Sequence, residues 1–324
     1  MKILIIRFSS IGDIVLTTPV IRCLKKQLPD VTIHYLTSDK FNTVLAYNPH
    51  IDTLHTLDKE QSAIIDTLRH EQFDLIIDLH HNIRSIKISK AIGAPTKRFF
   101  KANIEKWLYV NLKINRLPKE HIVERYMQTV AHLGVKNDQQ GLDFYLPEIQ
   151  VEEERLPPFF NNGYVGFVIG GAHQTKCLPA EKIASILNKL KAENVVLLGG
   201  PDDVTKAQQV LALTSHQAVF NACGKFNLME SAWLVKQATR IITHDTGLMH
   251  IAAAFQKPII SVWGNTVPEF GMYPYLPNNA PQHSIVEVKG LACRPCSKIG
   301  HKKCPRGHFK CMVNIDEGAF IQSN

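Results

Sequence analysis

The sequence lacks the signatures of several large protein classes. No run of roughly 18 uncharged apolar residues occurs, so we expect no transmembrane segment. Zinc-finger, helix-turn-helix and RNA-binding signatures are absent, as are blocks of Lys and Arg, and we expect no nucleic-acid partner. The loops G-x-G-x-x-G and G-x-x-x-x-G-K-[ST] are also missing. Their absence weakens a dinucleotide-binding interpretation and leaves nucleoside triphosphate hydrolysis unsupported.

What the sequence contains is typical of a globular protein with two domains. The chain has 324 residues, of which 45% are hydrophobic and 20% are charged, and this is enough apolar surface for two cores. The formal net charge of +8 attracts anions such as nucleic acid, anionic lipid headgroups or phosphorylated glycans. Because nucleic-acid motifs are absent, we expect the anionic partner to be a soluble nucleotide or a substrate at a membrane surface rather than a nucleic acid.

Short apolar runs alternate with helical patterns in both halves, which is typical of parallel sheets flanked by helices. Strands are predicted at residues 2–7, 32–36, 75–78, 164–169, 195–198, 240–243 and 258–262. The change of composition between residues 146 and 163 indicates a linker. We therefore predict an α/β protein with two doubly wound domains, residues 1–157 and 158–324, facing a cleft. Ligands of such sheets bind beyond the carboxyl ends of the strands.

The first loop of this kind is S-S-I-G-D, which places Asp13 at the start of a helix. The positive end of the helix favours an ionised carboxylate, and this suits a general base. The competing interpretation is a cap, because Asp at a helix start usually only satisfies free N–H groups. Position alone favours the cap.

The loop H-D-T-G-L-M-H follows the strand at 240–243 and opens an alanine-rich helix. Free amides at Thr246 and Gly247 make a natural seat for a phosphate oxygen. Asp245 would repel phosphate, so we expect it to hold the loop or meet a sugar hydroxyl; a plain capped turn is equally compatible with the motif. Lys176 lies in a third loop after a strand, and this position distinguishes it from an ordinary solvated lysine.

Taken together and in order, these loops resemble one family. The segments are S-S-I-G-D at 9–13, I-I-D-L-H-H-N-I-R-S at 76–85, G-A-H-Q-T-K at 171–176, G-G-P at 199–201, D-T-G-L-M-H at 245–250 and V-W-G-N-T at 262–266. Over most of its length the chain resembles glycosyltransferase family 9, the ADP-heptose:lipopolysaccharide heptosyltransferases.

The resemblance implies a GT-B architecture of two Rossmann-like domains, the first mainly for the acceptor and the second for the nucleotide sugar. It implies an inverting transfer, with no cofactor or catalytic metal, of a heptose from a donor such as ADP-heptose to the lipopolysaccharide core or a similar surface glycolipid. Asp13 would be the base. The implied donor-binding residues are Lys176, Asp245, Thr246, Gly247 and His250, and the acceptor-side candidates are Ser10, Gly12, His80 and Arg84.

The sequence also departs from the family pattern. Leu178 stands where the family often has Trp in K-x-W-P, and His80-His81 replace an amide-glycine pair. Asn265 replaces a residue that is frequently Pro or Ser. The change at His80 lies in the expected acceptor domain beside Arg84, so it bears on the identity of the acceptor.

The cysteines near the C-terminal end form a separate cluster, made of Cys293, Cys296, Cys304 and Cys311. A C-x-x-C pair with two further thiols can close a tetrahedral structural zinc site. Disulfides and free thiols are the alternatives. Basic neighbours could instead contact acceptor phosphates, or simply form a solvated face.

Two other functions are compatible with the same motifs. One is a sugar-nucleotide epimerase of similar shape, and the other is a catalytically silent module that binds a glycan or nucleotide sugar. For the transferase, the expected partners are the nucleotide sugar and an anionic glycolipid at the inner membrane surface. We accordingly expect a cytoplasmic protein, peripheral at the inner face of the cytoplasmic membrane.

Overall fold

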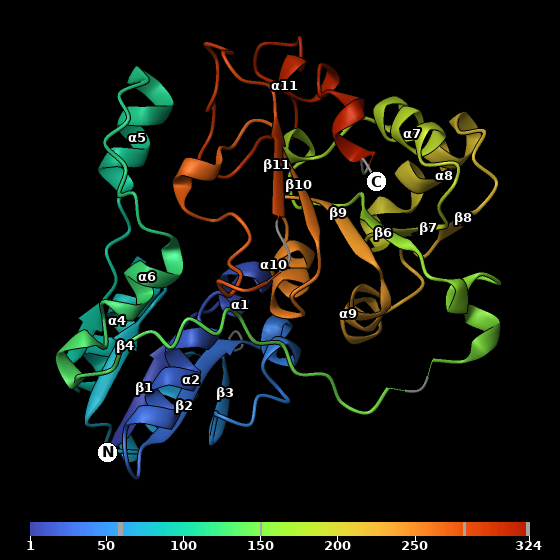
Figure 1. Cartoon of the computed structure of the whole chain (residues 1–324). Helices are drawn as coiled ribbons and strands as arrows, with labels where there is room; N and C mark the ends of the chain where they lie inside the picture. The colour runs from blue at the N-terminus through green and yellow to red at the C-terminus, as the bar shows by residue number, and fades with distance from the viewer. Residues whose placement is uncertain (58–60, 150, 281–282, 322–324) are drawn as a thin grey trace. The chain divides into compact units, whose positions relative to one another are not determined.

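The computed structural model describes residues 1–57, 61–149, 151–280 and 283–321. The chain divides into two compact units. Unit 1 contains residues 1–102, 120–147 and 275–278, and unit 2 contains 103–119, 148–274 and 279–324. Each unit is a parallel β-sheet flanked by helices (Figure 1). The prediction of two doubly wound α/β domains is therefore confirmed, whereas a domain boundary between residues 157 and 158 stays a prediction.

In its described residues, unit 1 holds a five-stranded sheet in the order β3-β2-β1-β4-β5. The strands are β1 (Lys2–Ile6), β2 (Thr32–Ser38), β3 (Thr53–Leu57), β4 (Leu75–Asp78) and β5 (Thr96–Arg98). The central strand β1 is an apolar run that is buried from Ile3 to Ile6, as expected for a strand covered on both faces. The strands predicted at 2–7, 32–36 and 75–78 are thus confirmed with small shifts at their ends.

The helices of unit 1 surround this sheet. They are α1 (Ile11–Val15), α2 (Thr18–Gln27), η1 (Asp39–Val44), α3 (Gln61–His70), α4 (Ile83–Ile92), α6 (Ile122–Met127) and η2 (Ala131–Leu133). Pro19 lies in the opening turn of α2, where its missing N–H is harmless. The Thr129 hydroxyl donates to the carbonyl of Tyr126 at 2.7 Å, near the break between α6 and η2.

Unit 2, as far as the structure describes it, holds a six-stranded parallel sheet in the order β11-β10-β9-β6-β7-β8. Its strands are β6 (Val165–Val168), β7 (Val195–Leu198), β8 (Val219–Asn221), β9 (Arg240–His244), β10 (Ile259–Trp263) and β11 (His283–Glu287). Its helices are α5 (Asn103–Leu112), η3 (Glu153–Arg155), η4 (Phe160–Asn162), η5 (Gln174–Lys176), α7 (Ala180–Lys189), η6 (Pro201–Asp203), α8 (Val204–Leu213), α9 (Leu228–Gln237), α10 (Gly247–Ala254), η7 (Pro268–Phe270), α11 (Lys310–Val313) and η8 (Glu317–Phe320). The core lies between the sheet and helices such as α7.

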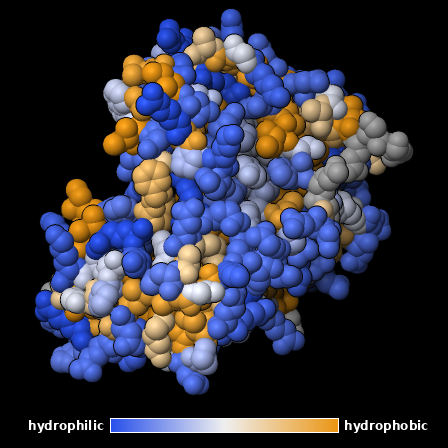
Figure 2. All heavy atoms as spheres, turned by 60° about the vertical axis from the view of Figure 1, so that its left-hand side comes forward, coloured by the Kyte–Doolittle hydropathy of each residue, from blue (hydrophilic) through white to orange (hydrophobic). Residues whose placement is uncertain are grey.

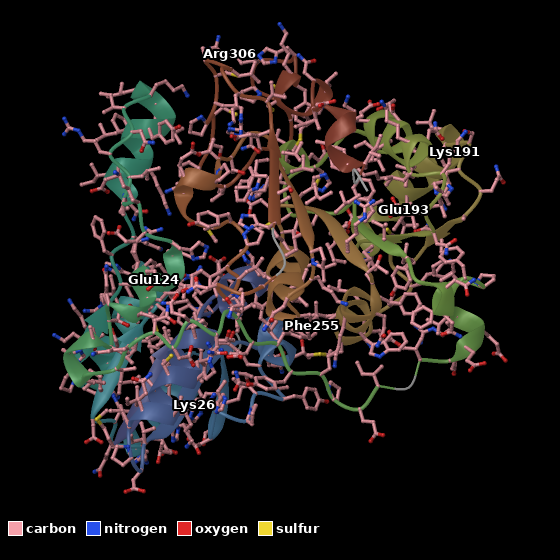
Figure 3. All side chains as sticks on the ribbon, viewed as in Figure 1. Lys26, Glu124, Lys191, Glu193, Phe255 and Arg306 are labelled. Atoms are coloured by element: carbon pink, nitrogen blue, oxygen red, sulfur yellow. The ribbon has the colours of Figure 1, made fainter. Side chains whose placement is uncertain are left out.

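A short segment late in the chain, Tyr275–Asn278, returns to unit 1. The Tyr275 hydroxyl donates to Glu124 of α6 at 2.5 Å and accepts from the Asn137 side chain at 2.7 Å. The Tyr275 ring also packs against His121, with centroids 4.7 Å apart. Figure 3 marks Glu124 on α6. We call this segment the strap of unit 1.

Each sheet reverses its strand order at one point. In unit 1 the reversal lies between β1 and β4, and in unit 2 it lies between β9 and β6. Such a switch point separates the loops at the carboxyl ends of the strands and is the usual place for a ligand. The loops after β1 and β4 carry Asp13 and His80, and those after β6 and β9 carry Lys176 and Asp245.

Candidate active site

The loop after β1 places Asp13 in the first turn of α1. Its carboxylate accepts from the Ser10 amide at 3.2 Å and from the Ser10 hydroxyl at 2.7 Å. The two residues therefore form a capping box, which is the competing interpretation that the sequence allowed. Gly12 lies buried in the same helix. A cap and a base are compatible, because a carboxylate has several acceptor positions.

Arg7, at the end of β1, adds a contact that we did not predict. Its guanidinium lies 2.6 Å from the other oxygen of Asp13, and it also donates to the carbonyls of Ser9 and Leu79 at 2.7 Å each. Burial by itself lowers the pKa of Arg7, but the Asp13 carboxylate together with Tyr126 and Tyr35 more than offsets this, and the pKa is raised. A fixed cation at this distance favours the charged form of the carboxylate.

The loop after β4 is organised by Asp78, which is fully buried. Its side chain accepts from the amides of His80 and His81 at 3.1 and 2.7 Å and from the Ser85 hydroxyl at 2.8 Å. The amide of Ser85 in turn donates to Asn82, the N-cap of α4. Hydrogen bonds to Asp78 and Asn82 therefore fix the loop after β4 along its length and into the first turn of α4.

His80 and Arg84, the predicted acceptor-side residues of this loop, both contact Phe8. The His80 ring centroid lies 4.9 Å from that of Phe8, and the Arg84 guanidinium carbon lies 5.5 Å from it. Burial and then the nearby Arg7 lower the pKa of His80 to about 3, so its imidazole is neutral near pH 7. Unit 1 thus brings together its predicted residues, with Phe8 as an unpredicted common support.

In unit 2, Lys176 is already paired with Asp245. The ammonium lies 2.6 Å from the carboxylate, and the two side chains are only 17% and 11% exposed. The Thr266 hydroxyl donates to the same carboxylate oxygen at 3.2 Å. The loops after β6, β9 and β10 therefore meet at the Asp245 carboxylate, and the role of Asp245 toward a ligand stays a prediction.

Thr246 and Gly247 begin helix α10. Thr246 is the N-cap with an extended backbone, and its hydroxyl accepts no hydrogen bond from the first amides of α10. His250 is buried in the same helix. His244, which we did not predict, is fully buried; its Nε2 accepts from the Leu178 amide at 3.0 Å. Burial lowers the pKa of His244 to about 3, consistent with this acceptor role.

The C-terminal segment 291–311, which we call the tail, fastens the loops after β6 and β10. The His301 carbonyl accepts from the Thr175 amide at 3.2 Å and from the Thr175 hydroxyl at 3.0 Å, and the His301 amide donates to that hydroxyl at 2.8 Å. Arg294 donates to the carbonyls of Gly264 and Thr266 at 2.5 and 3.1 Å. Its guanidinium also pairs with Glu287 at 2.9 Å.

The tail also carries the four clustered cysteines. In the described residues all seven cysteines of the chain are free thiols, and no three His, Cys, Asp or Glu side chains are arranged to hold a metal ion. Cys293 Sγ lies 3.9 Å from His308 Nε2. Burial raises the pKa of Cys311 to about 11. The structural zinc predicted at Cys293, Cys296, Cys304 and Cys311 therefore stays a hypothesis.

Comparison with known proteins adds independent information. Residues 62–305 match the profile of the family described as glycosyltransferase family 9 (heptosyltransferase). Lipopolysaccharide heptosyltransferase 1 of Campylobacter coli is 26% identical over 82% of this chain and 84% of its own. Lipooligosaccharide heptosyltransferase 2 of Haemophilus ducreyi is 28% identical over 99% of this chain and 98% of its own.

Solved structures agree with this result. A family 9 glycosyl transferase from Veillonella parvula has a TM-score of 0.71 at 27% identity and covers 89% of this chain and 86% of its own. The Escherichia coli ADP-heptose heptosyltransferase II has a TM-score of 0.66 at 21% identity, with 97% and 98% covered. The E. coli heptosyltransferase WaaC with ADP has a TM-score of 0.66 at 20% identity, with 88% and 92% covered. These matches show the GT-B fold that the sequence predicts.

Proposed function

Because the chain belongs to glycosyltransferase family 9 and is therefore a glycosyltransferase, we propose that it transfers a heptose from ADP-heptose to lipopolysaccharide or a similar surface glycolipid. The names of its relatives support both the sugar and the acceptor class. A relative of the same fold was solved with ADP, which supports the donor nucleotide. The observation that carries the proposal is the pairing of Lys176 with Asp245 beside the start of α10.

We propose that the diphosphate of the donor binds at this place in unit 2. The amides of Thr246 and Gly247 at the start of α10 would donate to its oxygens. Lys176 would turn from Asp245 to the phosphate, whose charge exceeds that of one carboxylate. Asp245 would then be free to accept a hydroxyl of the sugar, with His250 supporting the helix. This arrangement stabilises the departing diphosphate through fixed dipoles and one cation.

We propose Asp13 as the general base of an inverting transfer. The carboxylate would take the proton of the acceptor hydroxyl while the acceptor oxygen bonds to the anomeric carbon on the face opposite the diphosphate. The bond from that carbon to the phosphate oxygen would break, and its electron pair would leave with the diphosphate. Arg7 keeps the carboxylate charged and fixed, and a charged carboxylate also stabilises the positive sugar of the transition state.

The acceptor-side candidates suit an anionic glycan. Arg84 would pair with an acidic or phosphorylated group, and neutral His80 would offer a hydrogen bond without adding charge. Ser10 and Gly12 lie in the same loop and helix start as the base. With these contacts the acceptor would be a glycolipid at the inner face of the cytoplasmic membrane, where the protein would be a peripheral cytoplasmic enzyme.

A donor and acceptor panel with mass detection tests this function. Incubation with ADP-heptose and a heptose-deficient lipopolysaccharide should add one heptose and release ADP. An isomerised free donor without an acceptor would instead support the epimerase. Donor binding without turnover on any acceptor would support the silent binding module.

The structural zinc is a separate proposal. Its support is that the four tail cysteines and His308 line one small cavity, although metal binding would require these side chains to draw closer together than they stand. Elemental analysis of freshly purified protein should find about one zinc per chain, as a closed tetrahedral site requires. Metal-free protein with four reactive tail thiols would contradict it.

A further inference from the structure

Helix α5 (Asn103–Leu112) presents large apolar side chains to solvent. None of its residues, all of which the structure describes, is buried. The side chains of Ile104, Trp107 and Leu112 are 73%, 57% and 54% exposed. Single exposed apolar residues are common, but three on one ten-residue helix form a patch. In Figure 2, which turns the left-hand side of Figure 1 forward, hydrophobic residues stand exposed among hydrophilic ones.

The exposed apolar residues lie on one face of α5. Ile104 and Leu112, with the half-buried Leu108 between them, are spaced four residues apart and so form a stripe along the helix, with Trp107 beside it. Another face attaches the helix to the rest of unit 2. There the Tyr109 ring packs edge-on against Phe270, with centroids 6.3 Å apart.

Lys113 lies four residues after Tyr109, directly beyond the last residue of α5, and fixes this end of the helix. Its ammonium donates to the carbonyls of Pro295 and Cys293 in the tail at 2.7 and 3.3 Å. The helix is therefore held through Tyr109 and Lys113, while Ile104, Trp107 and Leu112 stay exposed. An ordinary surface helix instead packs its large apolar side chains inward.

The charges around the stripe are mainly positive. Residues 103–119 contain one carboxylate, Glu105, and four cations, Lys106, Lys113, Arg116 and Lys119, a net charge of +3. Arg116 and Lys119 are exposed. A short helix with an apolar face and cationic surroundings is typical of a segment that lies in the interface of an anionic membrane.

We propose that α5 and the residues that follow it to Lys119 dock the protein on an anionic lipid surface. Ile104, Trp107 and Leu112 would enter the headgroup region, and Arg116 and Lys119 would contact lipid phosphates. The described residues contain no helix long and apolar enough to cross a membrane. With ten residues, α5 is about half the length needed for spanning, so it would lie along the surface.

Charge favours a lipid surface over a second copy of the chain as the occupant. A twofold contact through the α5 stripe would bring two segments of net charge +3 together, whereas an anionic leaflet complements both segments. The inference rests on the proposed function, because a lipid-linked acceptor lies in such a leaflet. It goes further by naming the segment that binds it.

Vesicle binding by the full chain tests the proposal. Flotation should show binding to phosphatidylglycerol-containing vesicles at least tenfold tighter than to phosphatidylcholine vesicles, and weaker binding at high salt. Trp107 is the exposed tryptophan, because Trp263 is buried and Trp233 stacks on Phe160. Its emission should shift to the blue on binding and be quenched by brominated lipids.

Variants keep the test specific. Ile104→Ser with Leu112→Ser should weaken vesicle binding at least tenfold while keeping Trp107 as the probe. Leu211→Ser with Leu213→Ser is the matched control, because these residues are 36% and 51% exposed on α8 and should leave binding unchanged. Arg116→Gln with Lys119→Gln should weaken binding to anionic vesicles roughly tenfold or more.

The outcomes separate this proposal from the proposed function. The α5 serine variant should transfer sugar to a deacylated, water-soluble acceptor at the wild-type rate and lose rate only on vesicle-bound acceptor. Equal vesicle binding by the α5 variant and the wild type would overturn the proposal, as would a dimer, seen by light scattering, that this variant dissociates. Failure of transfer to every acceptor would overturn the function alone and leave the vesicle result standing.

Discussion

At the scale of single residues, the Lys176–Asp245 pair governs how the diphosphate site that we propose in unit 2 would meet an anion. The pair is mostly buried, so neither charge is fully hydrated and each depends on the other. An incoming diphosphate must therefore compete with Asp245 for the ammonium. It can do so because it carries more charge and because the amides at the start of α10 attract it as well.

The first prediction concerns Lys176. We expect Lys176→Ala to weaken binding of ADP at least tenfold. The variant lacks the cation that we propose for the diphosphate, and the negative charge of Asp245 is then no longer neutralised and repels the phosphates. Isothermal titration calorimetry measures this. Lys182→Ala is the control, since Lys182 also pairs with a carboxylate of unit 2, Glu317, yet takes no part in the proposed site. Unchanged affinity in Lys176→Ala would remove this lysine from donor binding.

The second prediction concerns Asp13. We expect Asp13→Asn to lower the rate of transfer roughly 100-fold or more, because the amide keeps the contacts to Ser10 but cannot take a proton. ADP affinity should stay within about twofold. Arg7 would lose its ionic partner, so we also expect about 1–3 kcal/mol less stability, discounted for the partial exposure of Asp13. Single-turnover assays below the lowered melting temperature separate the effects, and a normal rate there would exclude Asp13 as the base.

The positions of these residues could be predicted, but several of their contacts could not. Asp13, Lys176 and Thr246 follow strands, and the ends of parallel strands meet at one edge of a sheet. The Arg7–Asp13 pair depends on how the turn at Ser9 and Ser10 brings two nearby residues together, and no sequence pattern encodes that turn. The only sign of this pair in the sequence is that the charged residue Arg7 directly follows the apolar run 3–6.

At the scale of elements, the tail acts on the ends of strands to which it is not adjacent in sequence. Arg294 is a fork whose donors reach several carbonyls of the loop after β10 as well as Glu287 of β11. Five fixed N–H donors make this possible, and a lysine ammonium cannot reproduce the geometry. The shape of the loop that carries Thr266 therefore depends on the tail.

The third prediction follows from this fork. We expect Arg294→Lys to destabilise the protein by about 2–4 kcal/mol, because several buried carbonyls lose their donors. ADP binding should weaken as well, since Thr266 contacts Asp245. Denaturant unfolding and calorimetry measure the two effects. Arg155→Lys, at a partly exposed pair with Glu230, should change stability far less; a similar loss in both variants would contradict the role of Arg294.

Elements with strong apolar patterns were predictable, whereas those shaped by tertiary contacts were not. The run Ile3 to Ile6 reads as a buried strand and is one. The pattern of residues 120–133 predicts one helix, but the structure forms α6 followed by η2 there, so this prediction is wrong in its length. Strand β11 was not predicted, because its polar and half-exposed residues lack a buried pattern and it is fixed by pairing with β10.

At the scale of the whole molecule, buried neutral histidines lie in both units. In unit 1, His34 Nδ1 and His55 Nε2 lie 2.9 Å apart in a hydrogen bond, and burial lowers the pKa of each imidazole. His244 is the corresponding buried group of unit 2, with its pKa lowered to about 3 by burial. Below about pH 6.5 these histidines bind protons in the unfolded chain but stay neutral in the folded protein. The free energy of unfolding therefore decreases as the pH falls toward the lower pKa values of the folded protein.

The fourth prediction is this acid sensitivity. We expect the melting temperature to be highest above about pH 7 and to fall steadily toward pH 4.5, with His244 alone contributing about 2–3 kcal/mol of the loss. Differential scanning calorimetry across this range measures it. His244→Gln, which keeps an acceptor for the Leu178 amide, should flatten the profile, and His132→Gln on the exposed surface should not. A melting temperature that does not change with pH would contradict the prediction.

The strap has a consequence for how the protein is made. The chain passes between its two units five times, and residues 275–278 return to unit 1 only after most of unit 2 has been synthesised. A nascent chain leaves the ribosome from its N-terminus, so Glu124 and Asn137 emerge long before Tyr275 arrives to bond with them. Unit 1 therefore lacks the contacts of the strap until most of unit 2 has been synthesised. A fragment that ends at residue 147 would lack these contacts permanently.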